Sequence, residues 1–396
     1  MKKLIVLLCS FMLIQFCSCT KTSDTLKTGS TIKIGFIGPM TGEDSDYGIF
    51  PSQAVSIAVD EFNEQGGING FKVQLIVEDS VGKTEIGIQA ANKLVKTDKV
   101  LAIIGDPFSA VSLAIAPIVE WSKVVMISPG ASHKDLPDKG DFIFRTIVSD
   151  AVQAVVFAKY LATAENVKTA SILYINNAYS KSIAMDFWAE FEKEGGQILL
   201  VESANPGATD FKAQLKKINE KKAESLYLPN YSSDLAIIIK QAKEIGLKAK
   251  IYCSDGFGSP QIFNMIGDLA NGIVFTQKAQ QHQSQKAKDF ISKYEAKWGA
   301  TPSEQSFNAY DAACIILDAI KKTSSKGMFG GSLNIDRDQL RNFIAVTKDY
   351  DGVSGNITFT ENGDLVGNIG IFVAEDKNFK QMTSYKLDGG KLVELK

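Results

Sequence analysis

The sequence contains few of the residues that catalysis and metal binding need. Its 396 residues include two histidines and five cysteines, and Cys9, Cys17 and Cys19 all lie within the first 19 residues. Cys253 and Cys314 are left, without a metal-ligand spacing such as CxxC, and the spacing leaves open whether they form a disulfide or stay buried thiols. The GxGxxG, P-loop, GxSxG and HExxH patterns are also absent. We therefore expect no metal, no cofactor and no enzymatic activity.

The chain also lacks a surplus of charge. Its 43 basic and 45 acidic residues give a formal net charge of −2, and no basic block occurs. Nucleic acid is therefore not expected as a partner. A length of 396 residues, 45% of them hydrophobic, suits two globular lobes better than one core.

The first 19 residues differ from all that follow. Two lysines precede an apolar run over 4–16 that is too short to span a bilayer, which predicts a secretion signal. Ser18 and Cys19 are similar to the lipobox of bacterial lipoproteins, in which the cysteine is lipidated, although Phe16 departs from the usual aliphatic residue. The alternative is an ordinary cleavable signal. We expect secretion across the cytoplasmic membrane, a lipid on Cys19, and a flexible polar tether over 20–30.

From residue 31 onward, apolar β-runs alternate with amphipathic helices. This alternation predicts a doubly wound parallel sheet, and it restarts after residue 145. Helices at about 286–298, 304–322 and 338–346 then lack strands between them, and an antiparallel pattern follows residue 355. We predict an α/β protein of two Rossmann-like lobes, with lobe 1 over 31–147 and 278–354 and lobe 2 over 148–277 and 355–396. Three crossings, at Arg145 to Ser149, Thr276 to Gln280 and Ser354 to Thr358, would form a hinge.

Two turns in the first lobe stand out because each follows an apolar strand and carries hydroxyl residues. The strand over 101–104 leads to Ser109 at the start of a helix, and the strand over 124–127 leads to Ser132. Ligands of open α/β sheets bind at such strand ends, and helix N-termini attract anions. We expect Ser109, at an N-cap position, and Ser132 to form a carboxylate clamp.

Seven segments in order resemble one family. They are IKIGFIGPMTG, DEFNEQGGINGFKV, IIGDPFS, ISPGAS, INNAYSKS, LPNYSSD and YCSDGFG. The sequence from residue 31 to the C-terminus resembles the periplasmic branched-chain amino-acid binding proteins of ABC transporters, which have the type I periplasmic-binding fold.

The resemblance implies roles for particular residues. Ser109 would bind the ligand α-carboxylate, and the turn Gly130, Ala131 and Ser132 would bind both charged groups of the ligand. Tyr47 would lie beside the side-chain pocket. Tyr179 and Tyr231 would contact the ligand from lobe 2, where Asp255 would pair with the α-ammonium. Asp255 stands where leucine-binding members commonly have glutamate, and Gly130 stands in place of alanine.

The function that the resemblance implies is capture of an amino acid, branched-chain or another small aliphatic one, by hinge closure. The protein would be a monomeric, lipid-anchored partner of an ABC permease, or else of a ligand sensor. A rival within the same fold binds a ligand without an amine, such as an amide or an aromatic acid. A secreted enzyme is a second rival, which would need a nucleophile or cofactor motif that the sequence does not show.

Overall fold

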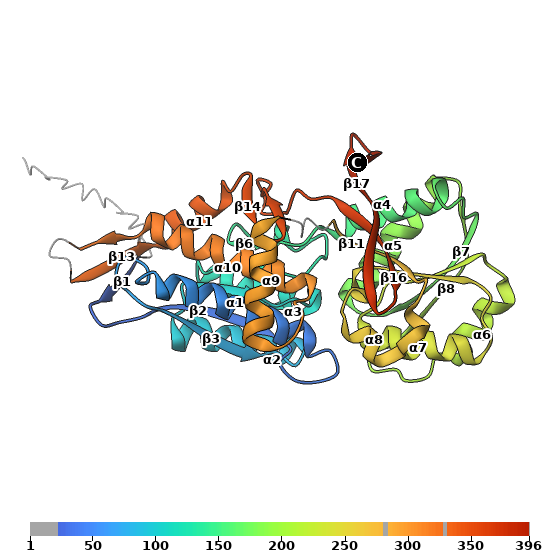
Figure 1. The fold of residues 1–396 in the computed structure, drawn as a ribbon, viewed down its shortest axis with the longest axis horizontal. Helices are drawn as coiled ribbons and strands as arrows, with labels where there is room; N and C mark the ends of the chain where they lie inside the picture. The colour runs from blue at the N-terminus through green and yellow to red at the C-terminus, as the bar shows by residue number, and fades with distance from the viewer. Residues whose placement is uncertain (1–22, 280–283, 328–330, 396) are drawn as a thin grey trace, which may run out of the picture.

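The computed structural model describes residues 23–279, 284–327 and 331–395. The predicted signal and Cys19 lie outside this part. Figure 1 shows two bodies, one holding the blue and orange parts of the chain and the other its green, yellow and red parts. The chain therefore leaves the first lobe, builds most of the second, and returns.

The first lobe is built on a parallel five-stranded sheet in the order β3-β2-β4-β5-β6. Every residue of β4 and β5 is buried, as expected of strands covered by helices on both faces. The strands are β2 (Ile32–Gly38), β3 (Val73–Asp79), β4 (Ala102–Gly105), β5 (Val125–Ser128) and β6 (Ile143–Arg145). The helices are α1 (Asp46–Glu64), α2 (Thr84–Asn92), α3 (Ser109–Trp121), α9 (Gln285–Trp298), α10 (Glu304–Thr323) and α11 (Arg337–Ala345).

The second lobe repeats this strand order. Its parallel part runs β8-β7-β9-β10-β11, and β16, β17 and β18 extend the sheet antiparallel from β11. The strands are β7 (Thr169–Ile175), β8 (Gln197–Ala204), β9 (Ser225–Leu228), β10 (Lys250–Cys253), β11 (Val274–Lys278), β16 (Ile369–Glu375), β17 (Asn378–Asp388) and β18 (Lys391–Leu395). The helices are α4 (Asp150–Thr163), α5 (Ala178–Lys193), α6 (Lys212–Lys221), α7 (Ser232–Glu244) and α8 (Gln261–Ile266).

In both lobes the strand order reverses beside the first strand, between β2 and β4 and between β7 and β9. Ligands of open α/β sheets bind outside the carboxyl ends of strands at such reversals. The loops that follow β2, β4, β7 and β9 are therefore where a ligand site is expected.

The predicted tether over 20–30 is wrong for its middle part. Residues Ser23–Lys27 form strand β1, which pairs antiparallel with β13 (Ser332–Asp336), and β13 also pairs with β12 (Ser325–Lys326). Asp24 accepts a hydrogen bond of 2.7 Å from Nε of the buried Arg337. A short polar strand looks like a linker in sequence because its partner lies about 300 residues away.

The predicted third crossing lies too early in the chain. The residues around 354 form a hairpin between β14 (Tyr350–Gly352) and β15 (Gly355–Ile357), which the predicted boundary would divide. Phe359 then packs on Phe144 of β6, with ring centroids 5.3 Å apart, and Ile369 is the first residue to pair with β11. The chain therefore passes to lobe 2 between these points, because the hairpin buries its apolar side against lobe 1.

Cys253 and Cys314 are free thiols, which answers the question that their spacing left open. Within the described residues, none of the helices has the length and apolar character that crossing a bilayer requires.

Candidate ligand-binding site

The residues expected to bind a ligand follow strand ends of both sheets. In lobe 1 they lie in α1 after β2, at the start of α3 after β4, and in the turn after β5: Tyr47, Ser109, Gly130, Ala131 and Ser132. In lobe 2 they lie after β7, β9 and β10: Tyr179, Tyr231 and Asp255. Five of these eight residues are buried, and Gly130, Tyr231 and Asp255 are half-buried.

The two lobes touch through aromatic and hydroxyl groups. The Tyr47 hydroxyl lies 2.8 Å from both the Ser232 hydroxyl and the Gly256 carbonyl oxygen of lobe 2. The ring of Phe108, from lobe 1, stacks on Tyr231 with centroids 4.4 Å apart, and Tyr231 also stacks on Tyr179 at 4.8 Å. The structure is therefore a closed form, in which lobe 2 covers the strand ends of lobe 1.

Ser109 is the first residue of α3, and Phe108, instead of the predicted Ser109, occupies the N-cap. The Ser109 hydroxyl oxygen accepts a hydrogen bond of 3.3 Å from the His133 backbone N–H. The Ser109 backbone N–H donates to the Tyr231 hydroxyl. The hydroxyl hydrogen and the helix N-terminus together offer donors to an anion without carrying a full charge.

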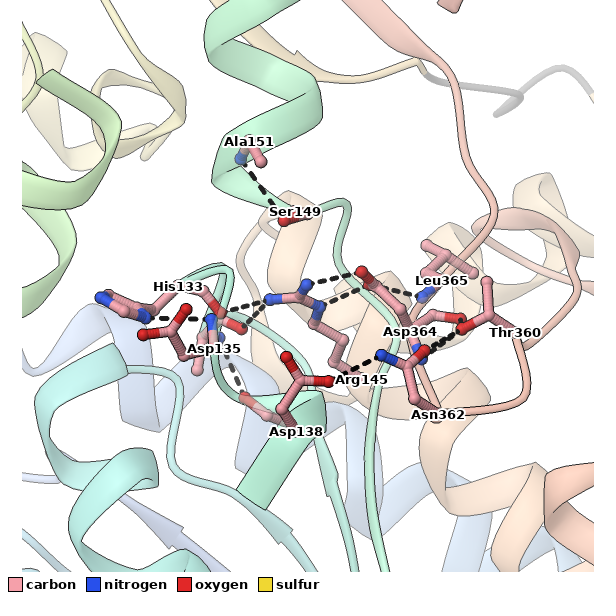
Figure 2. Close-up of polar contacts among 12 residues, drawn as sticks. His133, Asp135, Asp138, Arg145, Ser149, Ala151, Thr360, Asn362, Asp364 and Leu365 are labelled. Atoms are coloured by element: carbon pink, nitrogen blue, oxygen red, sulfur yellow. Dashed lines mark hydrogen bonds and ion pairs between the residues drawn. The ribbon is translucent and has the colours of Figure 1, made fainter. Parts of the chain in front are cut away.

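The guanidinium group of Arg145 donates hydrogen bonds to the turn after β5 (Figure 2). The guanidinium donates from Nη1 to the carbonyl oxygens of His133 at 2.8 Å and Ala131 at 3.5 Å. The Ser128 hydroxyl accepts from the Ala131 N–H at 2.9 Å. The Ser132 side chain is 1% exposed, and its Oγ has no hydrogen-bond partner of standard geometry. This hydroxyl lies close to the Asp150 carboxyl group, outside standard hydrogen-bond geometry.

Asp255 begins a short 3₁₀ turn, Asp255–Phe257, and is half-buried. It accepts a hydrogen bond of 2.5 Å from the Tyr179 hydroxyl, and its backbone N–H donates to Gln153 Oε1 at 3.2 Å. Burial raises the pKa of its carboxyl group, and the Tyr179 hydrogen bond opposes that rise. Within the described part of the chain, no lysine or arginine pairs with this carboxylate. An ionised Asp255 therefore calls for a cation.

Asp150 is a second buried acid that the sequence reasoning missed. It is the first residue of α4, and its backbone N–H donates to the Ser132 carbonyl oxygen at 2.8 Å. Burial raises the pKa of its carboxyl group, and the charge of Asp255 raises it further, while the Ser132 hydroxyl opposes the rise. The sequence Ser149-Asp150 reads as an ordinary helix start, and its place directly after a hinge segment was the available signal. Ser132, Asp150 and Asp255 thus belong to one electrostatic group.

A cavity between the lobes adjoins this group. Tyr47 and Asp255 both line it, together with Asp46, Gln277, Glu304 and Gln305. Ser109 and Ser132 are not part of its wall, and neither are Tyr231 and Asp150. Ring stacking joins Tyr231 to Tyr179, and a hydrogen bond joins Tyr179 to Asp255, whereas of the predicted residues Tyr47 and Asp255 reach the cavity.

Gly130 makes room in this cluster. A Cβ atom added to it would lie 2.9 Å from Pro107 Cβ and 3.0 Å from the Gln305 side-chain amide. Both distances are closer than carbon atoms pack in protein interiors. The absence of a side chain at Gly130 therefore lets Gln305 of α10 approach the turn that carries Ser132.

Comparisons with known proteins identify the family and the fold. The sequence model of a family described as periplasmic binding protein matches residues 31–378. The leucine-, isoleucine-, valine-, threonine- and alanine-binding protein of Pseudomonas aeruginosa is 28% identical over 336 residues, which cover 85% of this chain and 87% of that protein.

Two solved structures are similar along nearly their whole length. The leucine-binding protein LivK from Thermotoga maritima has a TM-score of 0.82 at 28% identity, covering 89% of this chain and 98% of that one. The branched-chain amino acid transporter substrate-binding protein LivJ from Streptococcus pneumoniae, solved in complex with isoleucine, has a TM-score of 0.81 at 26% identity, covering 92% and 100%. This likeness confirms the fold class that the alternation of strands and helices predicted.

Proposed function

Because the chain belongs to the periplasmic binding protein family, we propose that it captures an amino acid between its two lobes. The resemblance to branched-chain amino-acid binding proteins is confirmed by the relatives and by the similar structures. Its homologues are solute-binding proteins, and the family implies a place outside the cytoplasmic membrane. The proposal adds a ligand class and a set of contacts, and it assigns the protein no covalent chemistry.

The observation that supports an amino acid most directly is the half-buried Asp255 at the wall of the interlobe cavity, which pairs with no lysine or arginine of the described residues. A free amino acid is a zwitterion, and removing either charge from water costs several kcal/mol unless a protein group replaces the lost hydration. We assign the α-ammonium to Asp255, with Asp150 beside it and the carbonyls of Gly130 and Ala131 nearby. The hydrogen-bond donors of Ser109 and Ser132 would bind the α-carboxylate.

The aromatic residues would complete the site by excluding water. Tyr231 already joins the lobes by stacking on Phe108, and Tyr47 bonds across the interface. Closure around a ligand would bury its polar groups, where hydrogen bonds are strongest. The relatives are named for binding leucine, isoleucine, valine, threonine and alanine, or are solved with isoleucine bound, which supports a small aliphatic amino acid as the ligand class.

Membership in this family also leads us to propose how the protein delivers its ligand and how it is held at the membrane. The closed form would dock on an ABC permease, or on a ligand sensor, as a monomer. A lipid on Cys19 would hold it at the membrane. Cys19→Ala should move the protein from the membrane fraction to the soluble fraction, whereas Cys17→Ala should leave it in place.

Two measurements test the ligand class. Mass spectrometry of the small molecule that co-purifies with the protein should find an amino acid. A thermal-shift screen of amino acids, aromatic acids and amides should raise the melting temperature with amino acids only. A rise with benzoate or an amide alone would favour the rival ligand, although the buried Asp150 and the half-buried Asp255 would repel an acid without an amine. Turnover of a bound ligand would favour the enzyme.

A further inference from the structure

Trp121 is exposed at the end of lobe 1 that lies opposite the cleft. It is 85% exposed, more than any other large apolar residue of the described chain. It is the last residue of α3, and Ser109 is the first, so the two residues lie about 18 Å apart along the helix axis. A surface at Trp121 can therefore contact a partner without covering the ligand site.

The buried Arg337 joins three segments of the chain at this end. Its Nε atom donates a hydrogen bond of 2.7 Å to Asp24 of β1. Its Nη1 and Nη2 atoms donate to the carbonyl oxygens of Lys123 at 3.5 Å and Val100 at 3.3 Å. Trp121 therefore lies two residues from a group that contacts the same guanidinium as the beginning of β1. We call the surface formed by these segments the distal end, and it comprises residues 23–27, 98–101 and 121–123.

Strand β1 fixes the first described residues to the distal end. Ser23 pairs with Asp336, the residue before Arg337. Figure 1 shows β1 and β13 at the end of lobe 1 that is farthest from lobe 2. Cys19, to which the lipid is assigned, precedes Ser23 by four residues, and four residues of extended chain span at most about 14 Å. A lipid on Cys19 would therefore hold the distal end close to the bilayer.

The charges of the distal end are compatible with an anionic lipid surface. Lys99 is exposed, next to Val100 in the chain. Three acids of this region form ion pairs with bases: Asp98 with Lys93 at 3.1 Å, Asp141 with Arg341 at 3.3 Å, and Asp338 with Lys123 at 2.8 Å. Tryptophan is enriched where a bilayer meets water, because its ring has an apolar body and a polar N–H group.

We propose that the distal end of lobe 1 rests on the phospholipid bilayer, with the indole ring of Trp121 in the headgroup region. This inference rests on the proposed lipid on Cys19 and adds a second membrane contact to it. Removing the apolar ring from water is favourable, and its N–H group can still donate to headgroup or water oxygens. The lipid attaches the protein, whereas Trp121 orients it. The cleft, at the other end of α3, then faces away from the bilayer and stays open to solute.

Tryptophan quenching by brominated lipids tests this contact, because bromine in the acyl chains quenches a ring that reaches the bilayer. The chain has three tryptophans, which are Trp121, Trp188 and Trp298. The full chain, purified with its lipid, is reconstituted on vesicles of phosphatidylcholine and phosphatidylglycerol with or without brominated acyl chains. Bromine should lower the fluorescence of the wild-type protein, and Trp121→Phe should lose most of this decrease.

Trp298→Phe is the matched control. Trp298 is also a partly exposed tryptophan of lobe 1, at 39%, but it ends α9 and lies outside the distal end. This variant should keep the quenching of the wild-type protein. If Trp121→Phe is quenched as strongly as the wild-type protein, the proposal is overturned.

Flotation of the same vesicles separates this inference from the lipid anchor on which it rests. Wild-type protein that floats with the vesicles but is not quenched would overturn the inference and leave the anchor standing. Protein that carries no lipid and does not float would overturn both. A second copy of the chain is the alternative occupant of the distal end. If soluble Cys19→Ala protein sediments as a dimer and adding Trp121→Phe makes it a monomer, this face binds a second copy, and the bilayer contact is overturned.

Discussion

Arg145 and Asp364 form a two-pronged ion pair at the point where the chain passes between the lobes (Figure 2). Nε of Arg145 lies 2.7 Å from Asp364 Oδ1, and Nη2 lies 2.8 Å from Oδ2. The third prong of the guanidinium, Nη1, donates to the His133 carbonyl oxygen. The buried Arg145 side chain thus connects the segment around Asp364, where the chain passes to lobe 2, with the turn that carries Ser132.

Asp364→Ala should destabilise the fold by about 3 kcal/mol, because it leaves the guanidinium of Arg145 buried without its counter-charge. Arg145 has no exposed surface, so water cannot replace the carboxylate without a rearrangement of the turn. Urea denaturation of the variant and the wild-type protein measures the difference.

Asp138→Ala is the control for that prediction. Asp138 accepts a hydrogen bond of 3.0 Å from Asn362, two residues from Asp364, but it is exposed. Its loss should cost less than about 1 kcal/mol. Equal effects of the two substitutions would show that the buried ion pair has no special importance.

Asp255→Ala should weaken binding of an amino acid by at least about tenfold in calorimetry, since the α-ammonium would lose its buried counter-charge. Asp268→Ala, an exposed acid of the same lobe, should leave the constant unchanged. An unchanged dissociation constant for Asp255→Ala would show that Asp255 does not bind the α-ammonium.

The mouth of the cleft should make stability depend on pH. Burial raises the pKa of Asp44 to about 6, and burial together with the charge of Asp44 raises the pKa of Asp234 to about 7. Asp44 belongs to lobe 1, and it accepts hydrogen bonds across the interface from the Ser233 hydroxyl at 2.9 Å and the Ser233 N–H at 3.2 Å. The folded protein holds these protons more tightly than the unfolded chain, in which the carboxyl pKa is about 4.

The stabilisation from these groups is therefore complete below about pH 4 and is lost as the pH rises through 6 and 7. Asp234→Asn keeps an uncharged side chain at every pH. It should melt close to the wild-type temperature at pH 4 and at a clearly higher temperature at pH 8. A higher melting temperature at pH 4 but not at pH 8 would reverse the predicted sign.

The strand at the N-terminal end of the described chain should contribute to the stability of lobe 1. Asp24→Ala removes the carboxylate that Arg337 bonds at 2.7 Å, and Arg337 is buried beneath β1 and β13. We expect a loss of about 2 kcal/mol in urea denaturation. Thr25→Ala, which removes an exposed hydrogen bond to Asn334, should cost less than about half of that. Equal losses of stability in Asp24→Ala and Thr25→Ala would show that the Asp24–Arg337 pair does not anchor β1 to lobe 1.

The sequence predicts the α/β fold class because strands buried on both faces form apolar runs, such as the one through Ile103 and Ile104, and each is followed by a helix. It also predicts the turns of Ser109 and Ser132, since a local motif marks each. The structure then places both near Asp150 and Tyr231, as the strand order requires.

The rest depends on contacts that no local pattern records. Strand β1 is defined by a partner across the whole chain, and the third crossing by where Phe359 packs. Asp150 looks like a helix cap until the fold brings it to Ser132. Gln305 lies on α10, whose sequence pattern indicates only a helix packed on the sheet. It approaches the turn of Ser132 because residue 130 is a glycine and leaves space for its amide.

The central claim is that the closed cleft recognises both charged ends of an amino acid. Calorimetry on wild-type protein should compare the amino acid that binds most tightly with the carboxylic acid of the same carbon skeleton that lacks the amine. We predict that removing the amine weakens binding by about a hundredfold or more, because the Asp255 carboxylate is then left in the closed cleft without a cation. Equal binding of the two compounds would contradict the account.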